Sequence, residues 1–301
     1  MIYHNRTQAD FAPRGRTGAG PTEGLGRIDD LYYRSRIFPG LSVLVSQCIE
    51  GELPFSELTI DAYQAWVETG WKSPHGTYHA ADRLSRKGDE EVRELEEALG
   101  EYHSAGDPKH LLEEAGDNLW IHTARSSNSG NVISDSVKTR LYEYIAGTKV
   151  YIEDRPTEPQ WYDAAAQLAI KRGSPTLGEI DGITREGFIA RPSPVMNLFD
   201  DEVFSPYEAM LDLRVFGRAA SGLNLRQHDR EDGRWDVSVR SYEILAADVG
   251  TFTSEAYFRI ASLAHYAGST LADVVAVNMH KINQRVRDGL IDKTDGARPV
   301  G

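Results

Sequence analysis

The chain has 301 residues, 40% hydrophobic and 26% charged, which is typical of a globular protein with ample material for a buried core. Its formal net charge of −13 disfavours nucleic-acid binding, because an acidic surface repels a polyanion. No run of about eighteen apolar residues is present to span a membrane, and the single cysteine, Cys48, favours a reducing, cytoplasmic setting and is expected to be buried.

The first helix is predicted after an N-terminal tail and lead-in segment, residues 1–56. The start of this tail lacks the apolar core of a signal peptide. From residue 58, apolar residues recur at helical spacing: Ile60, Tyr63, Trp66 and Val67. Thr59 or Asp61 is a candidate cap for this helix.

Two further helices are predicted over residues 78–103 and 108–125. Gly106 suits the left-handed position that ends the first of them, and Asp107 with Pro108 suits the start of the second. Because the link is short, the two helices should form an antiparallel hairpin. The sequence SSNSGN after Arg125 is predicted to be a loop.

Residues 127–252 are predicted to be an α+β insertion. Helices are expected near residues 135–146 and 161–172, and a β-hairpin is expected with GLNLRQH (222–228) before the turn DREDGR and residues 235–239 after it. The helical pattern returns at residues 256–267, breaks at Gly268 and resumes from Leu271 to Arg287. Thr270 and Asp273 have the spacing of a capping box, Gly289 is a candidate end of the last helix, and residues 291–301 form a tail.

Acidic residues are concentrated on two of the predicted helices. On one helix, Glu94 lies four residues after Glu90 and three after Glu91, and on the next helix Asp117 lies three residues after Glu114. Each set therefore points from one side of its helix, and the hairpin allows the two sets to face each other. Facing carboxylates repel one another unless a cation such as Mg²⁺, which prefers hard oxygen ligands, lies between them. The alternative is an ordinary solvated helix face.

The pattern resembles the MazG-like, all-α nucleoside triphosphate pyrophosphohydrolases. These proteins carry a Glu-Glu-x-x-Glu helix followed by a Glu-x-x-Asp helix, which match Glu90 to Glu94 and Glu114 to Asp117, and an apolar pair follows at 119–120. The segments LTIDAYQAWVETGWK and STLADVVAVNMHKINQRVRDG resemble the first and last helices of the family. The chain departs from the family in its long insertion and in Gly88, which costs a helix about 1 kcal/mol relative to Ala.

The resemblance implies a mainly α fold: an antiparallel helical bundle of the four-helix type, formed by residues 57–126 and 253–290, with the inserted α+β segment. It implies a Mg²⁺-dependent enzyme, also served by Mn²⁺, that cleaves a nucleoside triphosphate between its α- and β-phosphates. The implied metal ligands are Glu91, Glu94, Glu114 and Asp117. The implied catalytic residues are Glu90 and Glu91, of which Glu90 is either a further metal ligand or the group that orients the attacking water.

The implied substrate-binding residues are Asn278, Lys281, Arg285, Trp71 and Lys72. Most of these residues also have a simpler explanation. Lys281 and Arg285 are equally well explained as solvated side chains of the last helix. Asn278 can be a buried link between helices, and Trp71 can be a core residue. Because a helical hairpin this short exposes an apolar face, a homodimer or homotetramer is also expected. Two alternatives stay open: a specialised dUTP/dCTP diphosphatase or phosphoribosyl-ATP pyrophosphatase, and a catalytically silent nucleotide sensor or scaffold.

Overall fold

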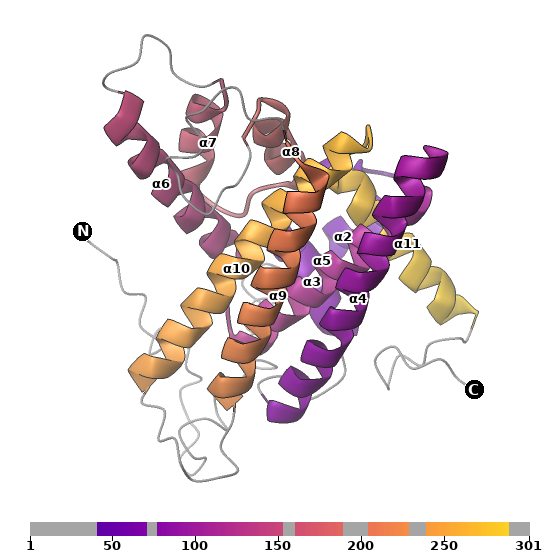
Figure 1. Cartoon of the computed structure of the whole chain (residues 1–301), viewed down its shortest axis with the longest axis horizontal. Coiled ribbons are helices and arrows are strands. Elements are labelled where there is room, and N and C mark those ends of the chain that lie inside the picture. The colour runs from indigo at the N-terminus through magenta and orange to yellow at the C-terminus, as the bar shows by residue number, and fades with distance from the viewer. Residues whose placement is uncertain (1–40, 71–76, 153–159, 189–203, 229–238, 289–301) are drawn as a thin grey trace.

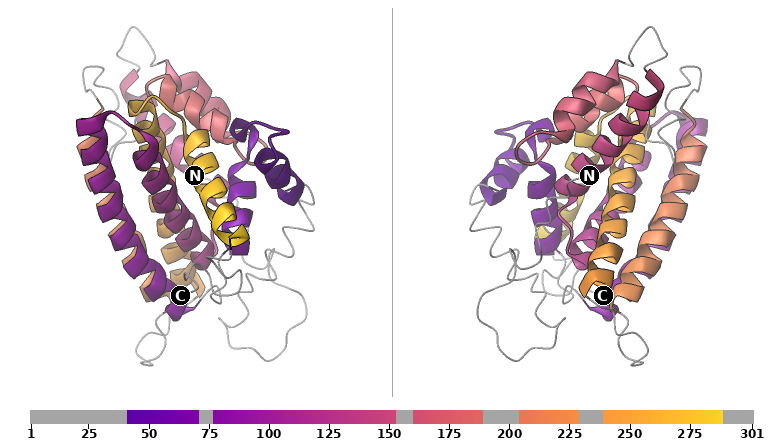
Figure 2. Two further views of the ribbon diagram at one scale, coloured as in Figure 1. Left: turned by 90° about the vertical axis from the view of Figure 1, so that its right-hand side faces the viewer. Right: turned by 90° about the vertical axis from the view of Figure 1, so that its left-hand side faces the viewer.

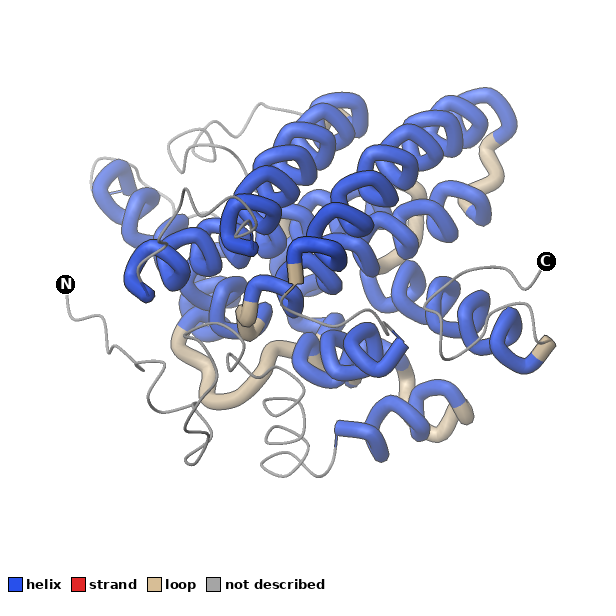
Figure 3. The backbone as a smooth tube through the Cα atoms, turned by 90° about the horizontal axis from the view of Figure 1, so that it is seen from below, coloured by secondary structure: helices blue, strands red, loops and turns tan. Residues whose placement is uncertain are grey.

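The computed structural model describes residues 41–70, 77–152, 160–188, 204–228 and 239–288, and these residues form helices joined by loops (Figure 1, Figure 3). The mainly α prediction is confirmed: within those ranges no strand occurs, and one isolated bridge pairs Thr59 with Thr176. The helices are α2 Leu41–Ile49, the 3-10 helix η2 Phe55–Glu57, α3 Ile60–Gly70, α4 Tyr78–Ala105, α5 Lys109–Ser129, α6 Ile133–Ile152, α7 Trp161–Ala169, α8 Leu177–Arg185, α9 Pro206–His228, α10 Val239–Tyr266 and α11 Leu271–Arg287.

Several helix ends follow from the local sequence, as predicted. Thr59 accepts a hydrogen bond from the amide of Ala62 and so caps α3. Gly106 ends α4 in the left-handed conformation, with a φ of 76°, a position that glycine takes without steric cost. Thr270 and Asp273 form the predicted capping box, since each side chain accepts a hydrogen bond from the other residue's amide at 3.0–3.1 Å.

The predicted loop after Arg125 is wrong, because α5 continues to Ser129. The polar residues at this end of the helix are buried and hydrogen-bonded to α9. The Asn128 amide donates to Asn224 Oδ1 over 2.8 Å, and the Gln227 amide donates to the Ser129 carbonyl over 3.0 Å. These tertiary contacts satisfy groups that would otherwise favour a loop in water.

The predicted hairpin is also wrong in its first strand, because residues 222–228 belong to α9. Its buried side chains recur at the spacing of a helix face: Ser221, Asn224, Gln227 and His228. These side chains contact the end of α5. In a helix they share one face and can all form hydrogen bonds there, whereas in a strand successive side chains would point to opposite faces. Val239, expected in the second strand, begins α10, while the turn and residues 235–238 lie outside the described ranges.

The helices surround α5. The long helices α4, α9 and α10 run next to one another (Figure 1), and α5 packs against all three. Side views show α4 and α9 on one side of α5, with α2, α3 and α11 on the other (Figure 2). Residues 127 and 252, where the insertion was expected to begin and end, fall inside α5 and α10. The described part of the predicted insertion therefore shares its helices with the rest of the fold.

One segment of the predicted insertion fixes the starts of α3 and α11. The Ile60 amide donates to the Pro175 carbonyl, and the Leu177 amide donates to the Leu58 carbonyl, each over 2.9 Å. The carboxylate of Asp181 on α8 accepts from the first amides of α11, at Leu271 over 2.7 Å and at Ala272 over 3.2 Å. A carboxylate at a helix N-terminus also complements the helix dipole. The position of α11 thus depends on α8.

Gly88 has a packing role that explains its presence in a helix. A Cβ at this position would lie 1.7 Å from Nη2 of Arg125. Arg125 is buried, and its Nη2 donates to the Leu84 carbonyl over 3.0 Å. Only glycine at position 88 leaves room for the guanidinium between α4 and α5. The helix propensity lost at Gly88 is thus the cost of that packing.

Two expectations from composition can also be compared with the structure. Cys48 is buried, as predicted, and burial raises the pKa of its thiol. Over the described ranges, no single helix is long and apolar enough to cross a membrane, and α10 with α11 meets that standard only as a pair bent by 98°.

Candidate metal centre

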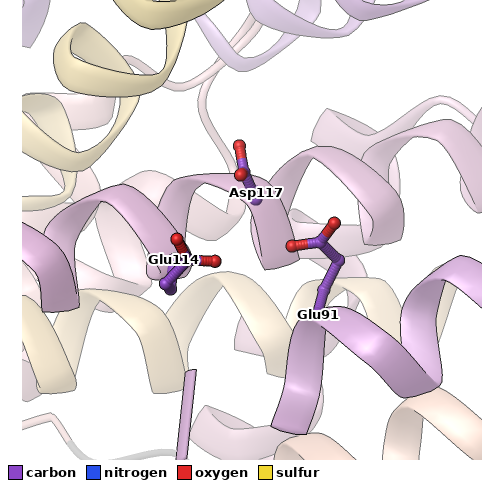
Figure 4. Close-up of side chains that lie close together, drawn as sticks. All are labelled: Glu91, Glu114 and Asp117. Carbon is purple, nitrogen blue, oxygen red and sulfur yellow. The ribbon is translucent and has the colours of Figure 1, made fainter. Parts of the chain in front are cut away.

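Three of the predicted metal ligands meet between α4 and α5. Glu91 reaches from α4 toward Glu114 and Asp117 on α5 (Figure 4), and each of the three offers an oxygen within 4.8 Å of the other two. The two residues on α5 are three apart, so they point from one side of that helix. We call these three residues the carboxylate cluster.

The carboxylate cluster is partly desolvated. Glu91 and Glu114 are buried, and within the described part of the chain the Oε2 atom of each has no hydrogen-bond partner. Burial raises the pKa of Glu91 to about 7, and it raises the pKa of Glu114 as well. The negative charge of Asp117 adds to both shifts. Buried carboxylate oxygens without partners are costly, and a bound cation would offset that cost.

Basic and amide groups surround the cluster. Lys281 of α11 donates to Asp117 Oδ2 over 2.6 Å and lies 3.8 Å from Glu114 Oε1. The Asn278 amide, also on α11, donates to Asp117 Oδ1 over 2.6 Å. Lys87 of α4 lies 2.7 Å from Glu91 Oε1. These contacts balance part of the negative charge and leave the Oε2 atoms of Glu91 and Glu114 for a further positive group.

A glycine lets α11 approach the cluster closely. A Cβ at Gly116 would lie 2.6 Å from the Cβ of Asn278 and 3.1 Å from the carbonyl oxygen of Val274. The helices α5 and α11 could not keep this separation with a larger residue there. Gly116 stands directly before Asp117, so the close approach occurs where Asn278 and Lys281 reach the carboxylate.

The structure separates the other expected carboxylates from the cluster. Glu94 is half-buried and is not among the three residues whose oxygens converge, although its charge contributes to the raised pKa of Glu91 and Glu114. Glu90 is exposed and accepts from Lys87 over 2.9 Å. Of the two expected catalytic residues, Glu91 is therefore the one that faces the other carboxylates.

The expected substrate-binding residues divide into three groups. Asn278 and Lys281 contact Asp117, so Asn278 orders a carboxylate in this state. Arg285, one turn further along α11, is exposed. Trp71 and Lys72 lie outside the described residues.

Two neighbours of the cluster were not among the residues expected from the sequence. Lys87 contacts Glu91, and His110 Nε2 lies 3.5 Å from Glu114 Oε1. The hydrogen bond between His110 Nδ1 and Glu101, at 2.6 Å, raises the pKa of this histidine. Each neighbour stands four residues before a cluster carboxylate, and that spacing is the signal that predicts the contact.

Comparison of this chain with protein-family models, with curated proteins and with solved structures gives no match. The resemblance to MazG-like pyrophosphohydrolases thus rests on the residues quoted from the sequence.

Proposed function

We propose that the protein is a Mg²⁺-dependent nucleoside triphosphate pyrophosphohydrolase that releases a nucleoside monophosphate and pyrophosphate. The observation that carries this proposal is the convergence of Glu91, Glu114 and Asp117, with two buried oxygens that find no hydrogen-bond partner among the described residues. The catalytic site would lie between α4, α5 and α11, which belong to the bundle predicted from residues 57–126 and 253–290, and the helices of the predicted insertion pack against this bundle. The sequence motifs that accompany these residues support the choice of reaction.

The donor set fits magnesium. Three carboxylates supply hard oxygen ligands, and no sulfur or imidazole ligand is among them. Glu91, Glu114 and Asp117 would hold the ion, and half-buried Glu94 would complete the set by a change of side-chain rotamer. A bound Mg²⁺ would offset the charge of the phosphates and polarise the phosphoryl group under attack.

The chain's own residues would then position water and substrate. A water oxygen attacks the α-phosphorus, the bond from that phosphorus to the bridging oxygen breaks, and pyrophosphate leaves with the bridging oxygen. Glu91, whose side chain faces Glu114 and Asp117, would hold the ion through one carboxylate oxygen and would orient the water and accept its proton through the other. Lys281 is well placed to leave Asp117 for a phosphate oxygen once a cation binds, and Arg285 follows one turn later on α11.

The decisive experiment separates pyrophosphate from orthophosphate among the products. Canonical, deoxy and modified nucleoside triphosphates, together with dUTP, dCTP and phosphoribosyl-ATP, would be incubated with the full chain and Mg²⁺ or Mn²⁺. We expect stoichiometric pyrophosphate and monophosphate, with rates reduced more than about 100-fold by Glu91→Gln or Asp117→Asn. Glu97→Gln is the matched control, because Glu97 is an exposed carboxylate on the same helix as Glu91.

The outcomes also decide between the remaining alternatives. A strong preference for dUTP, dCTP or phosphoribosyl-ATP would identify a specialised member of the same superfamily. Nucleotide binding without turnover, in Mg²⁺ and in Mn²⁺, would instead favour a sensor or scaffold. Turnover that survives both substitutions would overturn the role of the carboxylate cluster.

A further inference from the structure

An exposed apolar stripe runs along α9, in the segment for which the sequence predicts no role. Tyr207, Leu211 and Val215 are four residues apart and are 63%, 57% and 53% exposed. The helix α9 lies between α4 and α10 and also contacts α5 (Figure 1), so these exposed side chains lie on the part of α9 that its neighbouring helices leave uncovered. Single exposed apolar residues are ordinary, but three on one helix face form a patch that water solvates poorly.

The exposed positions have the spacing of a helix-pairing seam. Glu208, Leu211, Val215, Arg218 and Gly222 are all exposed and follow steps of three, four, three and four residues. This is the 3–4 repeat by which two helices pack side chains between one another. The glycine at the end of the seam would allow a close approach.

We propose that the occupant of this seam is the α9 helix of a second copy of the chain, packed antiparallel about a twofold axis. With the two helices in that register, Leu211 of one copy lies opposite Val215 of the other, and Tyr207 lies opposite the small side chain of Ala219. The same register sets Glu208 opposite Arg218. Twofold symmetry repeats each pairing, so one helix supplies both halves of the interface.

The charge of α9 supports this occupant. The whole chain has a net charge of −13, so most of its surface repels another copy. Within α9, three arginines (Arg214, Arg218, Arg226) outnumber two acidic residues (Glu208, Asp212), which gives the helix a formal charge of +1. Two of these arginines pair with carboxylates of α4, Arg214 with Glu96 and Arg218 with Asp89 at 3.6 Å, so the face is close to neutral. A near-neutral face meets less repulsion from a second copy than the acidic faces would, and Arg218, whose side chain is 68% exposed, can also reach the partner's carboxylate at the end of the apolar centre.

One end of the stripe is already ordered. The ring of Tyr207 stacks on that of His103 from α4, with centroids 5.2 Å apart, and its hydroxyl lies 3.2 Å from His103 Nδ1. The other nitrogen of His103 lies 2.8 Å from the hydroxyl of Tyr266 on α10. A tyrosine held in place before association loses little conformational entropy on binding, which is why such residues are common in interface centres.

The test is the molar mass of the full chain in solution, measured by light scattering and sedimentation over a wide range of concentrations. We expect a dimer, or a larger assembly that contains this contact, and we expect Leu211→Asp to raise the dissociation constant of the contact by about thirtyfold or more. Ile244→Asp on α10 is the matched control, because Ile244 is also 53% exposed but lies off the stripe. The control should keep the assembly of the unmodified chain.

A charge exchange tests the register. Glu208→Arg and Arg218→Glu should each weaken association, and the double variant should recover it, a result that a merely structural role for either residue would not give. A wild-type chain that stays monomeric, an assembly unaffected by Leu211→Asp, or equal dissociation by Ile244→Asp would overturn the proposal. The measurement requires no nucleotide, so its outcome is independent of the proposed hydrolysis.

Discussion

Asn278 donates its side-chain amide to Asp117 Oδ1 over 2.6 Å and so ties α11 to α5 at the carboxylate cluster. Lys281, one turn later on α11, approaches the other carboxylate oxygen of Asp117 over the same distance. Hydrogen bonds of this kind fix the orientation of a metal-binding carboxylate. The last helix is thus part of the candidate metal centre, although it carries none of the three carboxylates.

Replacement of Asn278 tests this relationship directly. We expect Asn278→Ala to weaken Mg²⁺ or Mn²⁺ binding by about tenfold or more, the effect usual for a group that orients a metal ligand. Titration calorimetry of the full chain measures the affinity. Gln284→Ala, an exposed position on the same helix, should leave it unchanged. Equal affinities for the wild type and Asn278→Ala would mean that Asp117 needs no such support.

The contact between Gly116 and α11 predicts opposite effects for two glycine substitutions. Gly116→Ala places a Cβ 2.6 Å from Asn278, so we expect the free energy of unfolding to fall by about 1–3 kcal/mol. A Cβ at Gly100 in α4 meets no atom within 4 Å, so Gly100→Ala should raise the free energy of unfolding by about 0.5–1 kcal/mol. Urea denaturation measures both changes. Similar effects for the two variants would contradict the tight packing at Gly116.

The raised pKa of Glu91 predicts a pH-dependent stability of the metal-free protein. Because burial raises the folded-state pKa to about 7, the folded chain holds this proton more tightly than the unfolded chain does. The stability that the proton contributes is full below the ordinary glutamate pKa and is lost as the pH rises through about 7. Gln cannot ionise, so Glu91→Gln without divalent cations should gain about 1–3 kcal/mol relative to the wild type between pH 5 and 8.

The same variant should respond differently to magnesium. A ligand that binds only the folded chain raises its melting temperature, so added Mg²⁺ should stabilise the wild type at pH 8. Glu91→Gln should show little of this rise in melting temperature, because the variant lacks one of the three carboxylates of the cluster. Thermal unfolding with and without EDTA measures it, and an equal Mg²⁺ shift in both proteins would place the cation elsewhere.

His122 predicts a loss of stability in acid. Its side chain is buried in α5, and burial lowers its pKa to about 3. The unfolded chain therefore takes up the proton first, and stability is lost as the pH falls from the ordinary histidine pKa toward 3, by at most about 1.4 kcal/mol per pH unit. His122→Leu should reduce the pH dependence of the urea unfolding midpoint between pH 7 and 5. His79→Leu, at an exposed position, should leave that pH dependence unchanged. The same slope in all three proteins would show that other groups cause the acid sensitivity.

Much of the helical framework could be predicted because its signals are local. The apolar spacing in α3, the left-handed position of Gly106 and the pairing of Thr270 with Asp273 depend on residues a few positions apart. The end of α5 and the second half of α9 could not be predicted in this way. Asn128 and Asn224 are 96 residues apart, and each favours a loop or turn until the other supplies its hydrogen bond.

The sequence by itself determined which side of each acidic helix carries its carboxylates, because the helical period fixes the direction of side chains three and four residues apart. Only the tertiary structure decided that Glu91, and not Glu90, meets Glu114 and Asp117. It also decided that Asn278 and Lys281 lie against Asp117. Those distances depend on how closely α4, α5 and α11 pack, and the packing depends on contacts such as Gly116 with Asn278 that no local pattern contains.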